Sequence, residues 1–398
     1  MENSRQTLID ALLNDQSHHI EFNGHLTNHN KHAVIALNGL GAPLERIKSY
    51  YDAYALNTPY GYGLEPPKVS KYTITQDNWM RYLGKRTSYS SYCDFFDLKE
   101  KELGTDELLK QYLPTLLPGW VGSLTHATIH IGWALDANHR WMLIEGLAYL
   151  AFSYVSCHPE RAIMHKEYSA EQSAMDSLLH IAGVLEQDGP GFQNWVESLI
   201  AETMPEGIHP ELVRSGLQYR IARLLTEGHP LIYMMPSWME NLDAATIWHQ
   251  LHYLVTILYM VKPGDFLMLH LITSLYAMEK IAEHLPPQHQ KEVIRCFWVG
   301  TLCILFSRGE FPKKMILEAL NFKYQNAVDD EKEPFIQKEW EQIIARALGE
   351  EEEHNPKMVY VLQRMWKTSG HRSIFRVAAA YFTTTPELPK SFEAAPIE

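Results

Sequence analysis

The chain has 398 residues, 46% hydrophobic and 21% charged, a composition that fits a globular protein and excludes a disordered or fibrous one. Its formal net charge of −13, without a cluster of Lys and Arg, argues against nucleic acid as a partner. The N-terminus lacks the basic start and apolar core of a secretory signal, and no uninterrupted apolar run reaches the roughly 20 residues of a membrane span. Four cysteines without a C-x-x-C pair suit a reducing compartment, so we expect a cytoplasmic protein without a membrane partner.

Helical periodicity dominates the chain, and alternating strand patterns are scarce. We predict a first helix over residues 24–37, ended by Asn38-Gly39, and a second helix after Gly41-Ala-Pro43 that pairs back on the first. Further helices are expected near residues 106–113, 123–137, 139–156, 168–186, 209–225, 241–260, 264–284, 289–307, 335–349, 356–367 and 372–382. These patterns predict an all-α fold with a single large multi-helix domain over residues 1–383 and an extended C-terminal tail over residues 384–398.

Histidine is abundant, with 20 residues, and neutral imidazole is the commonest metal ligand in proteins. His25, His29 and His32 step by four and then three, which places them on one face of the first predicted helix. Such a face could share a metal ion, or it could be a polar helix face with solvated histidines. His25 is the weakest of the three because it lies close to the start of the helix.

A second pair, His126 and His130, has i, i+4 spacing in apolar surroundings. The pair does not form the H-E-x-x-H motif of zinc proteases, because Ala127 stands where that motif has its glutamate. Buried histidines need hydrogen-bond partners, so the alternative to metal ligation is a pair of satisfied core residues. The spacing favours ligation.

Two single histidines complete the candidates. His270 lies in an apolar run, and His354 precedes Asn355-Pro356, with Lys357 three residues further on. Each alone is more typical of a structural residue. The 21 tyrosines and 10 tryptophans could line a pocket for a flat aromatic substrate, or simply fill the core of a large helical protein.

These blocks, in this order, resemble the questin oxidase-like family. The resembling stretches are Gly24 to His32 with Ala36-Leu37 and Leu40-Gly41-Ala42, His126 to Trp133, His270 to Ser274, and Trp340 through Lys357. The resemblance implies an oxygenase that inserts oxygen next to a ring carbonyl and cleaves a carbon–carbon bond of an aromatic polyketide or quinone. It also implies a mononuclear non-haem Fe(II) held mainly by histidines, with molecular oxygen as co-substrate. The need for NADPH stays open.

The candidate metal site lies between helices, and about four of its histidines should bind while the others act as outer donors or proton shuttles. Its candidate ligands are His29, His32, His126, His130, His270, His354 and Lys357, and the candidate catalytic residues are His126 and Lys357. No H-x-D or H-x-E pair falls in the histidine blocks, so the anionic ligand should come from elsewhere. A desolvated Lys357 could become a carbamate, which is chemically a carboxylate; otherwise it is a surface lysine.

Two other functions remain open on the residues alone. A zinc hydrolase or lyase could use the same histidines, because imidazole suits iron, copper and zinc alike. A non-catalytic helical protein could bind a metal, haem or aromatic ligand. The expected partner is a small aromatic molecule, and a homodimer is possible in an acidic, apolar-rich helical protein.

Overall fold

The computed structural model describes residues 2–164, 170–201, 212 and 215–387. Its longer helices are α1 (Glu2–Leu13), α2 (Asn30–Gly39), α3 (Leu44–Leu56), α4 (Tyr89–Leu103), α5 (Thr105–Leu116), α6 (His126–Asp136), α7 (Arg140–Phe152), α8 (Ala174–Asp188), α9 (Gly191–Ala201), α10 (Gly216–Glu227), α13 (Ala244–Val261), α14 (Phe266–Glu283), α15 (Pro287–Phe306), α16 (Lys314–Tyr324), α17 (Pro334–Gly349), α18 (His354–Thr368) and α19 (Ser373–Ala379). Short elements join them: α11 (Pro230–Tyr233), α12 (Trp238–Asn241), the 3₁₀ turns η1 (Trp79–Tyr82), η2 (Leu117–Gly119) and η3 (Pro159–Arg161), and four two-residue strands. The predicted all-α fold is confirmed.

The start of the first predicted helix was wrong. Strands β1 (Glu21–Phe22) and β2 (Leu26–Thr27) form a small antiparallel hairpin, and helix α2 begins only at Asn30. The loop between the strands holds Asn23 and Gly24 at φ values of 48° and 81°. Asn and Gly adopt positive φ readily, and such a pair is a strong hairpin signal. His25 therefore does not share a helix face with His29.

Of the longer helices, α1, α4, α9 and α16 were not among those predicted. In α4 the buried face is largely aromatic, with Tyr89, Tyr92, Phe95 and Phe96. Aromatic residues are enriched in strands, so this face is a weak helix signal in the sequence. The predictions that begin at residues 168 and 209 start outside the described residues, and their described parts correspond to α8 and α10.

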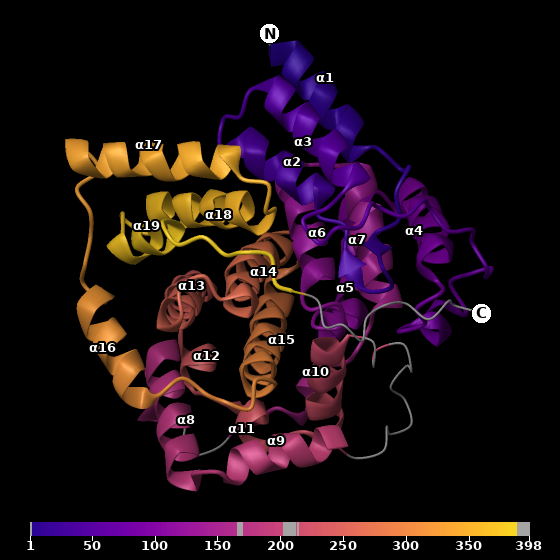
Figure 1. Cartoon of the computed structure of the whole chain (residues 1–398). Helices are drawn as coiled ribbons and strands as arrows, with labels where there is room; N and C mark the ends of the chain where they lie inside the picture. Colours follow the sequence, from indigo (N-terminus) through magenta and orange to yellow (C-terminus); the bar gives the residue numbers. More distant parts are fainter. Residues whose placement is uncertain (1, 165–169, 202–211, 213–214, 388–398) are drawn as a thin grey trace.

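The centre of the molecule is built on helix α6, which packs between α14 and α7. Helix α18 packs against α2 and α14, with α17 along its outer side (Figure 1). The N-terminal helices α1–α3 lie at the top in Figure 1, α4–α7 at the right, and α8–α12 below. Helices far apart in the sequence, α2, α6, α14 and α18, therefore meet in the core.

Two glycines allow α6 to approach its neighbours closely. A Cβ atom on Gly132 would lie 2.4 Å from the Cα of Ala277 on α14, and a Cβ on Gly146 of α7 would lie 2.9 Å from the backbone N of Ile131. Real Cβ atoms essentially never come so close to backbone. Glycine at both positions is thus a packing requirement, and it sets the spacing of the three helices.

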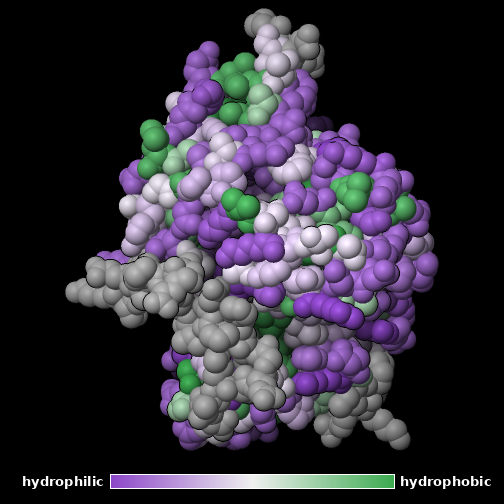
Figure 2. Space-filling view, turned by 90° about the vertical axis from the view of Figure 1, so that its right-hand side faces the viewer, coloured by the Kyte–Doolittle hydropathy of each residue, from purple (hydrophilic) through white to green (hydrophobic). Residues whose placement is uncertain are grey.

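The face in Figure 2 is mostly hydrophilic, with hydrophobic side chains in small separate patches. Among the described helices, none is long and apolar enough to cross a membrane. In the predicted tail, residues 384–387 form neither helix nor strand, and residues 388–398 lie outside the described part of the chain. The single-domain boundary at residue 383 stays a prediction.

Candidate metal centre

Four histidines from four different helices meet at the centre of the protein. The side chains of His29, His126, His270 and His354 each offer a ring nitrogen, and these nitrogens all lie within 4.8 Å of one another. All four residues are buried, His354 completely. In the part of the chain that the structure describes, no comparable group of histidines occurs elsewhere.

Three of these histidines stand at the N-terminal ends of their helices. His29 is the N-cap of α2, while His126 and His354 are the first residues of α6 and α18. His270 lies in the second turn of α14. Helix N-termini carry partial positive charge, so a cation held between them needs anionic groups nearby. Glu352 and Glu353, which precede α18 directly, place two carboxyl groups beside His354.

Hydrogen bonds made by Nδ1 orient three of the imidazole rings. His126 Nδ1 lies 2.6 Å from the Ser123 carbonyl oxygen, and His270 Nδ1 lies 2.7 Å from that of Phe266. A carbonyl oxygen only accepts, so each Nδ1 must donate its proton. His354 Nδ1 lies 2.5 Å from Glu352 Oε1 and is oriented in the same way. In a neutral ring, a protonated Nδ1 leaves the Nε2 lone pair free, as in protein metal sites.

These lone pairs face one another. The Nε2 atoms of His126 and His270 lie 3.0 Å apart, although neither carries a proton when both rings are neutral with protonated Nδ1. His354 Nε2 is buried and has no hydrogen-bond partner among the described residues. Buried polar atoms are nearly always satisfied, and a cation would satisfy all three at once. The residues present therefore fit a metal ion.

Burial keeps these rings neutral, the form that binds metals. Burial lowers the pKa of His126 to about 3, and the neighbouring charge of Lys357 acts in the same direction. Burial is also the largest cause that lowers the pKa of His29, His270 and His354 well below the usual value. A neutral imidazole needs no deprotonation before it ligates.

Lys357 is part of the same centre. Its side chain is completely buried, and its Nζ lies 2.9 Å from His29 Nδ1. Burial lowers the pKa of this amine to about 7, while the carboxylates of Glu353 and Glu352 act in the opposite direction. The alternative of a surface lysine on the first turn of α18 was wrong, because that turn faces the histidine cluster.

His32 and His130 lie one layer further out. His32 Nδ1 is 3.2 Å from His29 Nδ1, and the His32 and His130 ring centroids are 4.9 Å apart. His130 Nε2 lies 3.4 Å from Glu145 Oε2, which also forms a buried ion pair with Lys31 at 2.6 Å. Both histidines stand outside the group of four. His32 adjoins that group through His29, and His130 adjoins His32 in turn.

Several acidic neighbours escaped the sequence analysis. Glu352 precedes His354 by two residues, a spacing that a search for His followed by an acid does not find. Glu353 is completely buried, and burial raises the pKa of its carboxyl to about 8, with the charge of Glu352 as the second cause. Glu145 lies on α7 with no motif around it, so only the packing of α6 on α7 reveals it.

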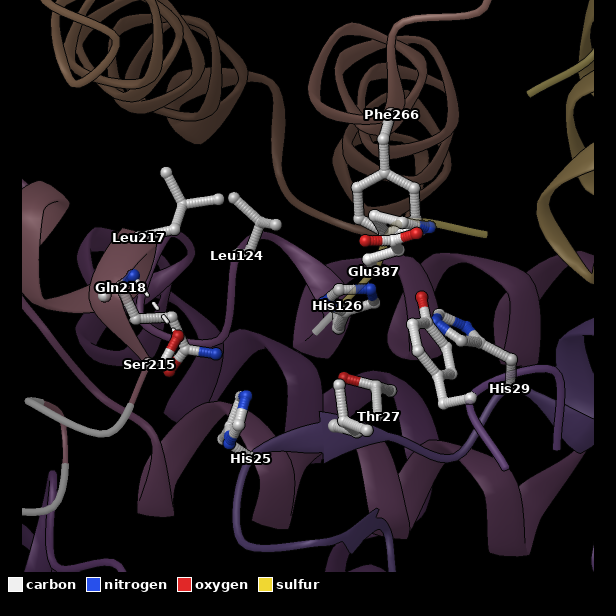
Figure 3. A pocket seen from close by; sticks show the side chains of 14 residues that line it. His25, Thr27, His29, Leu124, His126, Ser215, Leu217, Gln218, Phe266 and Glu387 are labelled. Carbon is white, nitrogen blue, oxygen red and sulfur yellow. Dashed lines mark hydrogen bonds between the residues drawn. The ribbon is translucent and has the colours of Figure 1, made fainter. Parts of the chain in front are cut away.

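A pocket of about 270 Å³ opens beside the histidines. His29 and His126 belong both to its wall and to the cluster of four (Figure 3). Apolar side chains make up much of the remaining wall, and the ring of Phe266 also contacts His270 and His354. The lining residues are His25, Leu26, Thr27, His29, Tyr60, Leu124, His126, Ser215, Gly216, Leu217, Gln218, Phe266, Pro386 and Glu387.

A strained turn holds His126 at this wall. Leu124 and Thr125 precede it with φ values of 48° and 69°, a region that residues with a Cβ seldom adopt. The turn brings the Ser123 carbonyl under the His126 ring and turns Leu124 into the pocket. Such strain is concentrated at functional sites, where the surrounding packing maintains it.

Comparison with known proteins agrees with this arrangement. The model of one family, described as questin oxidase-like, matches residues 26–362. The Baeyer-Villiger oxidase AgnL3 of Paecilomyces divaricatus is 28% identical over 176 residues, which cover 41% of this chain. The matched stretch spans 36% of that relative, just over a third of its length. The family match includes all four clustered histidines and Lys357.

Proposed function

Because the chain belongs to the questin oxidase-like family, and is an oxidoreductase by that membership, we propose that it is a non-haem iron oxygenase. Its substrate is an aromatic polyketide or a related quinone, and the reaction cleaves a ring carbon–carbon bond. The similarity to a relative named as a Baeyer-Villiger oxidase supports insertion of oxygen next to a ring carbonyl. The observation that carries the proposal is the position of His126, which faces both the metal-binding group and the pocket.

Bound iron would supply the activation of molecular oxygen, and this chain would supply the rest of the site. His126, His270 and His354 would hold the ion through Nε2, and the hydrogen bond made by each Nδ1 would fix the orientation of the ring. His29 would complete the group of four. The burial of all four excludes bulk water from the reacting atoms.

The pocket suits a flat, mostly apolar substrate. Leu124, Leu217 and Phe266 line it, and a volume of about 270 Å³ is near the lower end of small-molecule sites. A ring system in this pocket would lie directly against His126. We therefore assign His126 a second role, contact with the substrate, besides metal binding.

Lys357 is proposed as the source of the missing anionic ligand. A neutral buried amine can add carbon dioxide to give a carbamate, with release of one proton. The carbamate is a carboxylate in its ligand chemistry and would offset the charge of a buried ion. In the absence of carbon dioxide, Lys357 would instead orient His29 through their 2.9 Å contact.

Whether the reaction needs a reductant depends on how many atoms of O₂ enter the product. Insertion of one oxygen atom between a carbonyl carbon and its neighbour forms an ester and uses O₂, two electrons and two protons, with water as the second product. The electrons would come from a reduced nicotinamide such as NADPH or from the hydroquinone form of the substrate. Incorporation of both oxygen atoms into the product needs no reductant.

The test begins with anaerobically purified protein, whose metal content is measured in the wild type, His130→Ala and Lys357→Ala. The proposal is supported if the wild type contains near-stoichiometric iron, if Lys357→Ala contains less iron, and if a hydroxyanthraquinone causes oxygen uptake. Labelling with ¹⁸O₂ then counts the oxygen atoms incorporated. Zinc with activity under anaerobic conditions would point instead to a hydrolase or lyase, and binding without turnover to a carrier.

A further inference from the structure

One end of the pocket holds a buried amide that the proposed chemistry does not use. Gln218 lies in the first turn of α10 and is 6% exposed. Its Oε1 atom is buried and has no hydrogen-bond partner among the described residues. The same side chain lines the pocket beside the metal centre.

The backbone holds this side chain in place. Ser215 is the N-cap of α10, and its hydroxyl oxygen accepts a hydrogen bond from the Gln218 backbone N–H. The cap satisfies one of the free amide groups at the helix start, so the first turn is well defined. The backbone position from which the Gln218 side chain enters the pocket wall is therefore fixed.

A buried carbonyl oxygen without a donor costs free energy, and such groups in native proteins generally have a partner or a functional reason. The side chain that carries this atom lines a pocket for a small molecule. The simplest partner is a hydrogen-bond donor carried by that molecule.

The pocket also limits the kind of donor. His29 and His126 lie toward the metal-binding group, so a metal ion bound there would make the far end of the pocket positively charged. An ammonium donor would be repelled there, although the exposed Glu387 lies on the same wall. A carboxylate offers no donor to Oε1. A neutral hydroxyl on an aromatic ring meets both conditions.

The positions of the polar side chains along the pocket define how a substrate would be oriented in it. In Figure 3, Gln218 and Ser215 lie at one end of the pocket, His29 at the other, and His126 between them. We propose that Gln218 is a specificity-determining residue whose carboxamide oxygen accepts a hydrogen bond from a phenolic hydroxyl of the substrate. This contact fixes which ring carbon is presented to His126. The inference rests on the proposed function for the identity of the pocket as a substrate site.

The test compares three matched ligands on matched variants. Binding of anthraquinone, 1-hydroxyanthraquinone and 2-hydroxyanthraquinone to the metal-loaded protein is measured by quenching of tryptophan fluorescence. We expect the wild type to prefer one hydroxy isomer over anthraquinone by roughly 3- to 10-fold, the contribution of one hydrogen bond. Gln218→Leu, which keeps the size but loses the acceptor, should abolish the preference, so that it binds the hydroxy isomers no more tightly than anthraquinone. Gln218→Glu should preserve it, because a carboxylate still accepts.

The control is Gln193→Leu, an exposed position on α9, which should behave as wild type. A wild type without preference for either hydroxy isomer, or a Gln218→Leu variant that retains the preference, would overturn the inference. Metal content and oxygen uptake, measured on the same samples, report on the proposed function separately. Loss of those two with the hydroxyl preference intact would remove the oxygenase assignment and leave Gln218 as a recognition residue.

Discussion

The Nε2 atoms of His126 and His270 lie 3.0 Å apart while the Nδ1 atom of each ring faces a backbone carbonyl oxygen. Two neutral rings with protonated Nδ1 atoms place two lone pairs against each other, an arrangement that a shared cation stabilises. The backbone therefore dictates the tautomer of the two rings.

The first prediction distinguishes the metal-binding histidines from the histidines that lie next to them. His270→Ala should lower the iron content of the purified protein at least tenfold, because it removes an Nε2 donor from the group of four. His32→Ala should weaken metal affinity less, since His32 adjoins the group through His29. Metal analysis by mass spectrometry checks both. His289→Ala, on the outer part of α15, is the control and should keep the wild-type content. Equal losses in the His270 and His32 variants would contradict the division.

The second prediction concerns the carbamate of Lys357. Protein equilibrated with ¹³C-labelled bicarbonate should show a carbamate carbon signal in the NMR spectrum, and Lys357→Ala should lack it. Acetate at high concentration should restore part of the metal binding of Lys357→Ala, because it returns a carboxylate to the vacated space. A wild-type spectrum identical to that of the variant would leave Lys357 as a partner of His29 only.

The third prediction is a pH dependence of stability in metal-free protein. Burial lowers the pKa of His126 to about 3 and that of His19 to about 4, so both stay neutral when unfolded histidines begin to bind protons below pH about 6.5. The stability present above pH 6.5 should be lost as the pH falls, by about 1.4 kcal/mol per pH unit for each such histidine. Burial raises the pKa of Glu353 to about 8 and that of Glu171 to about 7, and these carboxyl groups contribute in the opposite sense. They are outnumbered by the buried histidines, because burial also lowers the pKa of His29, His270 and His354.

Urea denaturation of the metal-free protein between pH 8 and pH 5 measures this slope. His126→Asn should reduce it by about the contribution of one histidine. Stability that rises as the pH falls would show that the carboxyl groups dominate.

The fourth prediction tests the spacing of α6 and α14. Gly132→Ala places a Cβ 2.4 Å from the Cα of Ala277, so the helices must separate. We expect a loss of about 1–3 kcal/mol in the free energy of unfolding and a weaker metal affinity, although no ligand changes. Gly183→Ala on α8 is the matched control, because its nearest neighbour is the flexible side chain of Lys314 at 3.7 Å. There, alanine should be neutral or stabilising. Wild-type metal affinity in Gly132→Ala would show that the site does not depend on this approach.

The fifth prediction concerns the segment that follows α19. Thr385 donates its hydroxyl hydrogen to Glu352, whose other carboxylate oxygen orients His354. Thr385→Ala should weaken metal affinity by roughly tenfold, the lower end of the loss caused by removing an outer partner of a ligand. Thr385→Ser keeps the hydroxyl and should restore the wild-type value. Equal affinities in the alanine and serine variants would exclude this hydrogen bond from the site.

Local pattern was sufficient for much of the fold. The spacing of apolar residues predicted α6, α7, α13, α14 and α15 close to their observed bounds, because one buried face repeats with the helical period. The same reasoning placed the first helix too early, since the Asn23-Gly24 turn interrupts it. It missed α4 because the buried face of that helix is aromatic.

The histidine blocks were visible in the sequence, but the sequence did not show which of these histidines belong to the group of four and which lie outside it. Periodicity states which residues share a helix face, and it contains no information on how far apart two helices lie. The close approach at Gly132 and the left-handed turn at Thr125 bring His126 against His270, while His130 turns toward Glu145.

The sequence by itself determined the residue types of this centre: imidazole nitrogen donors and a lysine one turn after His354. Only the tertiary structure decided that four of these histidines converge, that Lys357 is buried among them, and that Gln218 faces the same pocket. Burial and mutual distance depend on contacts between segments hundreds of residues apart. Those contacts follow from the packing of whole helices rather than from any local motif.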